Sequence, residues 1–256
     1  MIRRAFKILA FLLLLGIYLL SSKFLSAFSS NETRKRRHLI FNTSRFCRIL
    51  LHLLGITVSV EEEQTMPSGK SRLILANHLS YIDVAAISAF LPAVFVTSYE
   101  IRDSPLEGFL ARCAGSVFVD RRGKAALRAD IRALAGLLKQ GFTVVLFPEA
   151  TSSSGESVLP FKSALLDAAL EVGSNILPVC VNYLSIDGNK ITTLNRDNVF
   201  YYGDMQFADH FLRLLKLHTI HLELRVLESV PAEISERKSA AKLAFECISK
   251  AYLSVH

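Results

Sequence analysis

The chain has 256 residues, of which 51% are hydrophobic and 21% are charged, and its formal net charge is +7. This apolar content excludes a disordered chain, because disorder requires low hydrophobicity and high charge. The 12 glycines and 7 prolines exclude a collagen-like or low-complexity sequence. Four cysteines are too few for a disulfide scaffold.

The positive charge is concentrated at the amino terminus. Residues 1–60 contain ten Lys or Arg residues and one acid, Glu32, whereas the remaining residues contain 20 bases and 22 acids. A nucleic-acid-binding protein usually carries basic residues across its folded surface, so this distribution argues against a nucleic-acid partner. A basic and apolar amino terminus instead predicts contact with an anionic membrane surface.

The first apolar run, Ile8 to Leu20, has 13 residues without a charge. As a helix it would span about 20 Å, less than the roughly 30 Å of a bilayer's hydrocarbon core. Continued to Phe28 it would be long enough, but it would then include Lys23. The run is compatible with a secretory signal, with a single-pass anchor and with a helix half-immersed in one leaflet. The sequence does not separate the last two.

A polar segment and a second helix follow. Residues 29–37 (SSNETRKRR) end in four consecutive bases, which predicts a polybasic linker docked on anionic headgroups. Residues 39–56 have polar positions recurring every three or four residues, the pattern of an amphipathic helix. Residues 1–56 are therefore expected to form membrane-associated helices with a polybasic linker, and residues 57–256 a separate α/β domain.

The body alternates short apolar strands with helices, which predicts a mostly parallel twisted sheet flanked by helices. The expected strands are 57–63, 71–76, 93–98, 116–120, 142–147, 175–182 and 219–227. The expected helices are 81–91, 105–114, 124–140, 161–172, 207–216 and 235–253, with a hairpin-like region near 191–202. Ser104 and Pro105 are read as the cap and first residue of the second of these helices.

The segment NHLSYID, residues 77–83, lies between the expected strand 71–76 and the next helix. The carboxyl ends of strands are where α/β sheets bind ligands. Asp83 follows His78 by five residues, so its carboxylate can reach back to one imidazole nitrogen and leave the other nitrogen basic. This is a general base with its orienting partner, without a protein nucleophile. The alternative is that these polar residues only cap a helix.

Three further motifs follow in order: GSVFVDR at 115–121, FPEATSS at 147–153 with PFK at 160–162, and ILPV at 176–179. Over residues 57–185 the set resembles the glycerophospholipid acyltransferase family, in particular its bacterial 1-acylglycerol-3-phosphate branch. The family pattern is N-H-x4-D, then G-x-x-F-[IV]-x-R, then F-P-E-G-T-R-S with a later F-K, and then a [VI]-P-[VI] strand. A membrane-binding helix pair at the amino terminus is also a family trait.

The resemblance implies an O-acyltransferase that moves a fatty acyl group from acyl-coenzyme A or acyl carrier protein to a lysophospholipid. The first choice of acceptor is 1-acylglycerol-3-phosphate, which would become phosphatidic acid. The thioester is a co-substrate, and neither a metal nor a bound cofactor is implied. The expected location is the bacterial inner membrane, with the catalytic domain on the cytoplasmic side. The implied catalytic residues are His78 and Asp83, and the implied substrate-binding residues are Arg121, Glu149, Thr151 and Lys162.

Two residues depart from the family pattern: Ala150 replaces a glycine and Ser152 replaces an arginine. Losing a guanidinium removes a bidentate anion clamp, so an acceptor without a phosphomonoester, such as lyso-ornithine lipid, stays an alternative. Two other classes remain: an inactive membrane-anchored α/β protein, and a hydrolase that uses His78 on water. The spacing of His210, His218 and His221 matches no known metal site, and His221 is expected to face outward from a strand.

Overall fold

The computed structural model describes residues 2–62, 71–120 and 123–254. The strands are β1 (Ile56–Glu62), β2 (Arg72–Ala76), β3 (Val94–Ser98), β4 (Val117–Val119), β5 (Thr143–Leu146), β6 (Asn175–Ile186), β7 (Asn189–Lys190) and β8 (Ile220–Val226). The α-helices are α1 (Ile2–Ala27), α2 (Glu32–Leu54), α3 (Tyr81–Phe90), α4 (Tyr99–Arg102), α5 (Glu107–Cys113), α6 (Lys124–Lys139), α7 (Asp167–Leu170), α8 (Phe207–Leu214) and α9 (Arg237–Ala251). Two 3-10 helices, Ala164–Leu166 and Arg196–Asn198, complete the described elements.

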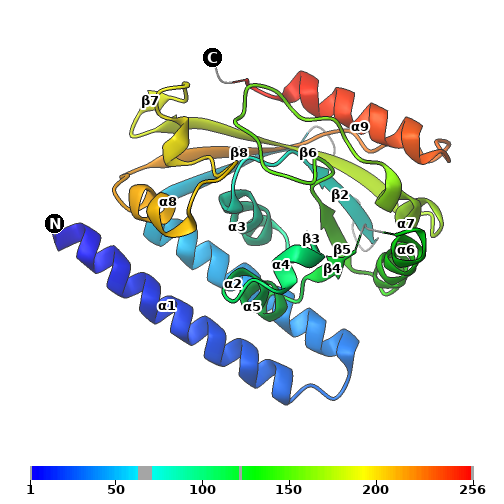
Figure 1. The fold of residues 1–256 in the computed structure, drawn as a ribbon, viewed down its shortest axis with the longest axis horizontal. Helices are drawn as coiled ribbons and strands as arrows, with labels where there is room; N and C mark the ends of the chain where they lie inside the picture. The colour runs from blue at the N-terminus through cyan, green and yellow to red at the C-terminus, as the bar shows by residue number, and fades with distance from the viewer. Residues whose placement is uncertain (1, 63–70, 121–122, 255–256) are drawn as a thin grey trace.

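The strands form one sheet in the order β1-β8-β6-β2-β5-β3-β4, with β7 paired to β6 (Figure 1). The central strands β6, β2, β5, β3 and β4 pair in parallel, and so do β1 and β8. β6 and β8 pair antiparallel. The prediction of a mostly parallel sheet flanked by helices is therefore confirmed.

Both faces of the sheet are buried. The side chains of each strand point alternately to opposite sides, so each strand contributes to two cores. In β2, Leu73 and Leu75 pack in one core with residues of α6, α7 and α9. Ile74 and Ala76 pack in a second core with residues of α2, α3 and α8. Helices on both faces explain why the central strands read as continuous apolar runs.

Three predicted elements differ from the structure. The helix expected from Pro105 begins at Glu107, after the short helix α4. The helix expected over 161–172 is reduced to a 3-10 turn and α7, because the backbone N–H of Lys162 donates to the Pro148 carbonyl and keeps residues 161–163 out of the helix. The region 191–202 holds a 3-10 turn where a hairpin was expected, since β6 continues to residue 186 and pairs with β7.

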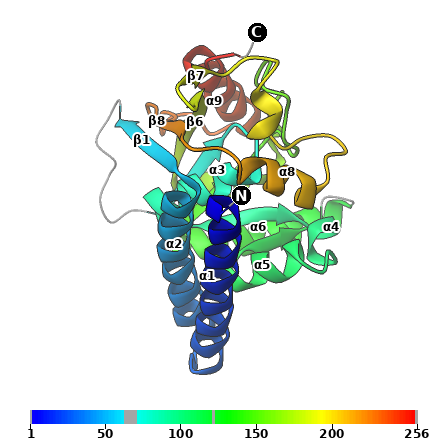
Figure 2. The same cartoon turned by 90° about the vertical axis from the view of Figure 1, so that its left-hand side faces the viewer.

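Helices α1 and α2 form an antiparallel hairpin along one side of the body (Figures 1 and 2). Polar side chains join the two helices: the Tyr18 and Thr43 hydroxyls lie 2.9 Å apart, and the Asn42 amide donates to Ser22 at 2.9 Å. Near the start of α1, the Lys7 ammonium donates to the carbonyl of Leu54 at 2.9 Å. Polar residues within and on either side of the apolar run therefore fix α1 against α2.

The sequence predicted a polybasic linker over residues 29–37, and this prediction is wrong in the length of the linker. Helix α2 begins at Glu32, and the Asn31 side chain caps it by accepting from two backbone N–H groups. The four consecutive bases therefore lie on the first turns of α2. One of them, Arg37, donates to the Gln140 carbonyl at 3.1 Å and lies over the Phe142 ring, so it contacts the body.

The expected division at residue 56 stays a prediction, but packing across it is extensive. Leu51 and Leu54 of α2 are buried in the same core as Ile74 and Phe95, and α2 packs against α3. Helix α2 is therefore an integral part of the α/β body. The outer face of α1 is different: from Arg3 to Ala27 the helix is long and apolar enough to cross a membrane, and little of it is buried.

Candidate active site

His78 and Asp83 meet at the carboxyl end of β2. The loop after the strand carries His78, and Asp83 lies in the first turn of α3, so a short local backbone path joins them. The His78 Nδ1 and Asp83 Oδ2 atoms are 2.9 Å apart. Because Nδ1 is engaged with the carboxylate, Nε2 is the nitrogen left to accept a proton from outside. The predicted pairing of these two side chains is thus present.

The Asp83 carboxylate is completely buried and surrounded by donors. Its Oδ2 also accepts from the backbone N–H groups of Leu79, at 2.6 Å, and Ser80, at 2.9 Å. Its Oδ1 accepts from the Tyr183 hydroxyl at 2.7 Å. A buried carboxylate is costly unless it is hydrogen-bonded, and these donors meet that requirement.

Glu149 follows β5, the strand beside β2, and is 4% exposed. Its Oε1 accepts from the backbone N–H of His78 at 2.8 Å, and its Oε2 accepts from the backbone N–H of Leu159 at 3.0 Å. Burial raises the pKa of Glu149 from 4.5 to about 7. On the other side, the Ser153 N–H donates to the His78 carbonyl at 3.0 Å. The backbone of His78 is therefore held at both its N–H and its carbonyl.

The His78 ring stacks on the Phe147 ring, with centroids 4.1 Å apart and an interplanar angle of 18°. The side chain nevertheless keeps 21% of its surface exposed. The stacking and the Asp83 contact restrict the ring to one orientation while a substrate can still reach it.

The other predicted site residues lie in a more open environment. Thr151 is exposed, and its hydroxyl donates to the neighbouring Ser152 carbonyl at 3.4 Å. Ala150 has φ +63°, the left-handed conformation that favours the family's glycine. Lys162 is exposed and lines a cavity of about 280 Å³ that Leu146 also lines, at the carboxyl end of β5.

Arg121, predicted to bind the acceptor's phosphate, lies outside the described residues, as does Arg122. Among the described predicted residues, the structure brings His78, Asp83 and Glu149 into one hydrogen-bonded network. It places Thr151 and Lys162 outside that network.

Two residues that support this site were not predicted from the sequence. The Asn77 side chain accepts from the Val181 N–H at 2.7 Å and donates to the Val181 carbonyl at 3.0 Å, which ties the end of β2 to β6. Tyr183 lies further along β6, and burial raises its pKa well above the usual value, so its hydroxyl stays a donor. In the sequence, Asn77 stands out only as a polar residue next to His78. Tyr183 stands out only as a polar group within an otherwise apolar strand.

The remaining histidines are placed elsewhere. His221 is exposed on β8, as expected. His210 is buried on α8 beside the Tyr81 hydroxyl at 2.8 Å, and burial lowers its pKa to about 4. Within residues 2–62, 71–120 and 123–254, no group of three or more His, Cys, Asp or Glu side chains is arranged to hold a metal ion.

Comparison with known proteins matches residues 57–182 to the family described as Acyltransferase. The 1-acyl-sn-glycerol-3-phosphate acyltransferase of Neisseria gonorrhoeae is 31% identical over 170 residues, covering 66% of this chain and 64% of the relative. The lyso-ornithine lipid O-acyltransferase of Pseudomonas aeruginosa is 32% identical, covering 69% and 66%. That of Rhodobacter capsulatus is also 32% identical, covering 78% and 71%.

The chain thus spans about two thirds of the length of the Neisseria and Pseudomonas relatives. The fold matches the crystal structure of the 1-acyl-sn-glycerophosphate acyltransferase from Thermotoga maritima, with a TM-score of 0.68, 23% identity and coverage of 98% and 95%. His78, Asp83 and Glu149 all lie within the segment that the family match covers, and the similarity to the Rhodobacter protein extends well beyond it. This chain belongs to the acyltransferase family.

Proposed function

We propose that the protein is a membrane-associated O-acyltransferase that moves a fatty acyl group from an acyl thioester to the hydroxyl of a lysolipid. The observation that supports this most directly is the 2.9 Å contact between His78 Nδ1 and the buried Asp83 carboxylate. It engages Nδ1, so Nε2 is the nitrogen available to take a proton, and the side chain keeps 21% of its surface exposed. The names of the relatives agree with this reaction.

In the proposed reaction, His78 Nε2 takes the proton from the acceptor's hydroxyl as the oxygen attacks the thioester carbonyl. The new C–O bond forms a tetrahedral intermediate, whose collapse breaks the C–S bond, and the thiolate takes the proton back from the imidazolium. The Asp83 carboxylate stabilises the imidazolium between these steps. General-base catalysis of this kind is typically worth about 10²–10⁴-fold in rate.

We propose acyl-coenzyme A or acyl carrier protein as the donor. A thioester is reactive enough that the mechanism needs no covalent enzyme intermediate, and no step in it requires a metal or a bound cofactor. Glu149 and Ser153 hold the backbone of His78. Since both oxygens of Glu149 are engaged with backbone N–H groups, it serves as a positioning residue, whereas the sequence analysis expected it to bind the acceptor.

The acceptor has two candidates. The first is 1-acylglycerol-3-phosphate, whose phosphate would be held by Arg121 and Lys162 beside Thr151. The second is a lysolipid without a phosphomonoester, such as lyso-ornithine lipid. Ser152 favours the second, because serine cannot replace the bidentate clamp of the family's arginine. Relatives of both names match this chain at similar identity.

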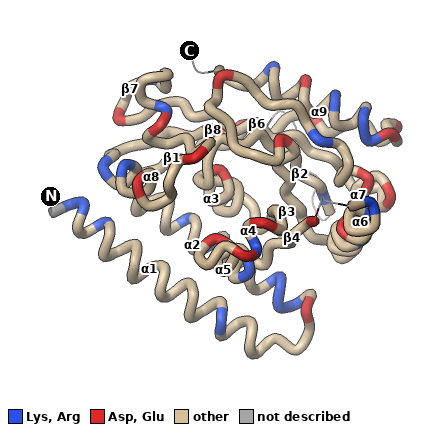
Figure 3. Tube along the Cα trace, in the orientation of Figure 1, with Lys and Arg blue, Asp and Glu red and all other residues tan. Residues whose placement is uncertain are grey.

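We propose that α1 lies half-immersed in one leaflet. Its contacts with α2 and the body run from Arg3 to Ser22, so the helix is not free to cross the bilayer alone. Figure 3 shows the middle of α1 almost free of charged residues; between Ile8 and Ala27 only Lys23 is charged. The large exposed hydrophobic side chains of α1 and its end are Phe6, Leu9, Leu12, Leu13, Ile17, Leu20, Phe24 and Phe28.

The same proposal places the protein on a bacterial inner membrane, with the catalytic domain facing the cytoplasm, where thioester donors are found. The polar stripe of α1 faces α2, and its apolar face would enter the lipid. An interfacial helix of this kind binds through buried apolar area and through attraction between bases and anionic lipid.

The test is to incubate the purified full chain, in detergent, with labelled acyl-coenzyme A and a panel of lysolipids. Transfer of the label to a lysolipid supports the proposal, release of free fatty acid indicates a hydrolase, and neither product indicates an inactive protein. His78→Ala should lower transfer by about 10²–10⁴-fold. His221→Ala removes an exposed histidine on β8 and is the matched control. Transfer by His78→Ala within tenfold of the natural chain would contradict the assignment of the base.

A further inference from the structure

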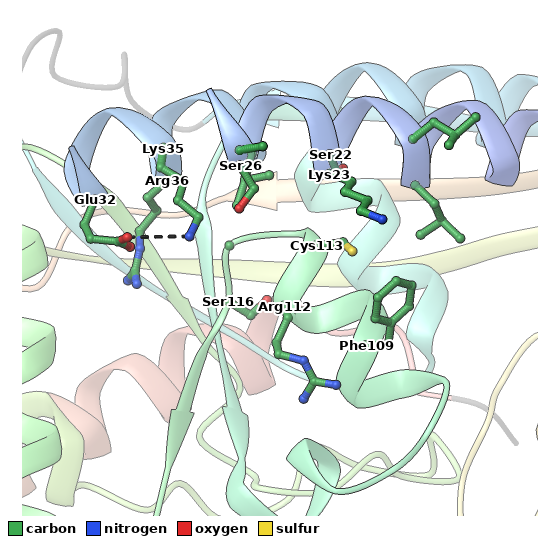
Figure 4. Close-up of a pocket in the computed structure, with 15 residues that line it drawn as sticks. Ser22, Lys23, Ser26, Glu32, Lys35, Arg36, Phe109, Arg112, Cys113 and Ser116 are labelled. Carbon is green, nitrogen blue, oxygen red and sulfur yellow. Dashed lines mark hydrogen bonds and ion pairs between the residues drawn. The ribbon is translucent and has the colours of Figure 1, made fainter. Parts of the chain in front are cut away.

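A cavity of about 770 Å³ lies between the α1–α2 hairpin and α5, away from the residues assigned to catalysis (Figure 4). Its lining includes Gly115 and Ser116, which precede the amino end of β4. His78 and Glu149 follow the carboxyl ends of β2 and β5. Since β2, β5, β3 and β4 all run parallel, the cavity and the catalytic residues lie at opposite edges of the sheet.

The cavity is strongly positive. Its lining contains four cations, Lys23, Lys35, Arg36 and Arg112, and a single acid, Glu32. The Glu32 carboxylate lies 3.5 Å from the Lys35 ammonium, so that pair is matched and the other three cations remain in excess. The half-buried guanidinium of Arg36 is partly desolvated, which lowers its pKa and favours an anionic ligand beside it.

The same cavity also has an apolar part. Leu19, Leu20 and Leu39 line it from the hairpin, and Phe109 lines it from α5. Leu20 is 72% exposed and Phe109 is 44% exposed, so both can meet a ligand that enters from the outer face of α1. Figure 4 shows Lys35 and Arg36 at one end of the cavity, and Lys23 and Phe109 toward the other.

A cavity that holds cations beside apolar side chains suits an anionic amphiphile. We propose that this cavity binds the headgroup of one anionic phospholipid, with its phosphate against Arg36 at one end and its glycerol and upper acyl chain along Leu20 and toward Phe109 at the other. The cavity opens beside the apolar face of α1 that we place in the membrane, so a lipid can enter it from the leaflet. This site is separate from acyl transfer: it rests on the proposed placement of α1 in the leaflet and not on the proposed reaction.

The test uses the purified full chain in a neutral detergent, mixed with phosphatidylglycerol or with phosphatidylcholine. Native mass spectrometry then counts the lipid molecules that stay bound. We expect one phosphatidylglycerol per chain and at least tenfold weaker retention of phosphatidylcholine. The double variant Lys23→Ala and Arg36→Ala should retain phosphatidylglycerol at least about tenfold more weakly, because it loses the charge-assisted contact of Arg36 and a second positive charge of the lining.

The matched control is the double variant Arg34→Ala and Arg45→Ala, which removes the same charge from exposed positions of α2 that do not line the cavity. This control should retain phosphatidylglycerol as the natural chain does. Equal loss in both double variants would overturn the proposal, because it would indicate general attraction to the hairpin surface.

A second variant keeps every cation in place. Ser26 lines the cavity, so Ser26→Phe should fill part of it and reduce lipid retention without changing the charge. Unchanged retention in this variant would overturn the proposal. Inorganic phosphate, added at the lipid's concentration, should not displace phosphatidylglycerol, and displacement would overturn the lipid as the occupant. Acyl transfer, measured on the same samples, reports separately on the proposed function.

Discussion

The Asp83 carboxylate and the segment 150–152 both follow strands that end at the same edge of the sheet, yet they are built differently. Asp83 is fully buried, and its two oxygens accept hydrogen bonds from one imidazole, two backbone N–H groups and one tyrosine hydroxyl. Thr151 is exposed and Ser152 is half-exposed, and the Thr151 hydroxyl donates to the neighbouring Ser152 carbonyl at 3.4 Å.

The difference separates two tasks. A general base must stay in one orientation and one tautomer, and a closed hydrogen-bonded network enforces both. A surface that selects an acceptor can change without disturbing that network, because in the described part of the chain the side chains of Thr151 and Ser152 make no hydrogen bond to His78, Asp83 or Glu149. Both departures from the family pattern, Ala150 and Ser152, fall in this open segment, while the residues around His78 keep the pattern.

Among changes within the buried hydrogen-bonded network, the largest effect is expected from Asp83→Asn. The asparagine oxygen can still accept from His78, and its amide can donate to the Tyr183 oxygen, so the fold should survive. The variant loses the negative charge that stabilises the imidazolium, and kcat should fall by about 10²–10⁴-fold. The measurement is steady-state transfer, with the exposed Asp209→Asn as control. A kcat within threefold of the natural chain would contradict the orienting role.

Glu149→Gln tests the support beneath His78. In the variant, the glutamine NH2 group would face a backbone N–H that now donates to Glu149, so two donors would meet. This mismatch should lower the free energy of unfolding by about 1–3 kcal/mol. Because burial raises the native pKa of Glu149 to about 7, its contribution to stability is full below about pH 4.5 and is lost as the pH rises through 7.

Denaturant unfolding of the natural chain and Glu149→Gln between pH 4 and 8 checks this expectation. The stability advantage of the natural chain should be largest at the acid end and shrink toward pH 7. His210 has the opposite pH dependence, since burial lowers its pKa to about 4, but it is common to both proteins and cancels in the difference. Curves that stay parallel across this range would contradict the titration of Glu149.

Tyr183→Phe removes one donor from Asp83 and should lower kcat by about tenfold, the effect of losing roughly one hydrogen bond to a charged group. The KM for the acceptor should not change, because Tyr183 is fully buried behind the carboxylate. The matched control is Tyr252→Phe, which removes a hydroxyl that donates to the Gly155 carbonyl at 2.8 Å. Equal losses of kcat in both variants would indicate a general packing effect.

The smallest effect is expected from a change in the exposed segment 150–152. If the acceptor is 1-acylglycerol-3-phosphate, Ser152→Arg should lower its KM by about three- to tenfold, because a charge-assisted contact to the phosphate is added. If the acceptor lacks a phosphomonoester, the same change adds an unpaired cation and should reduce turnover. Ser152→Gln separates size from charge. No change with either lysolipid would mean that residue 152 does not face the acceptor.

Local sequence determined much of the fold and half of the network. The alternation of apolar strands and helices predicted the parallel sheet, and most element bounds agree with the structure within one or two residues. The contact between His78 and Asp83 was also predictable. Asp83 follows His78 by five residues across the start of a helix, and this short backbone path keeps the two side chains close together. The contact between His78 and Asp83 depends on backbone geometry within a single turn.

Tertiary structure decided the rest. Tyr183 lies 100 residues after Asp83, and Glu149 lies 71 residues after His78. They join the network because β6 and β5 are the two neighbours of β2 in the sheet. The order of strands depends on packing over the whole domain, so no local pattern could show which polar groups would meet. The serines just after the first apolar run were visible in the sequence, but only the packing of α1 on α2 showed that Ser22 accepts a hydrogen bond from Asn42.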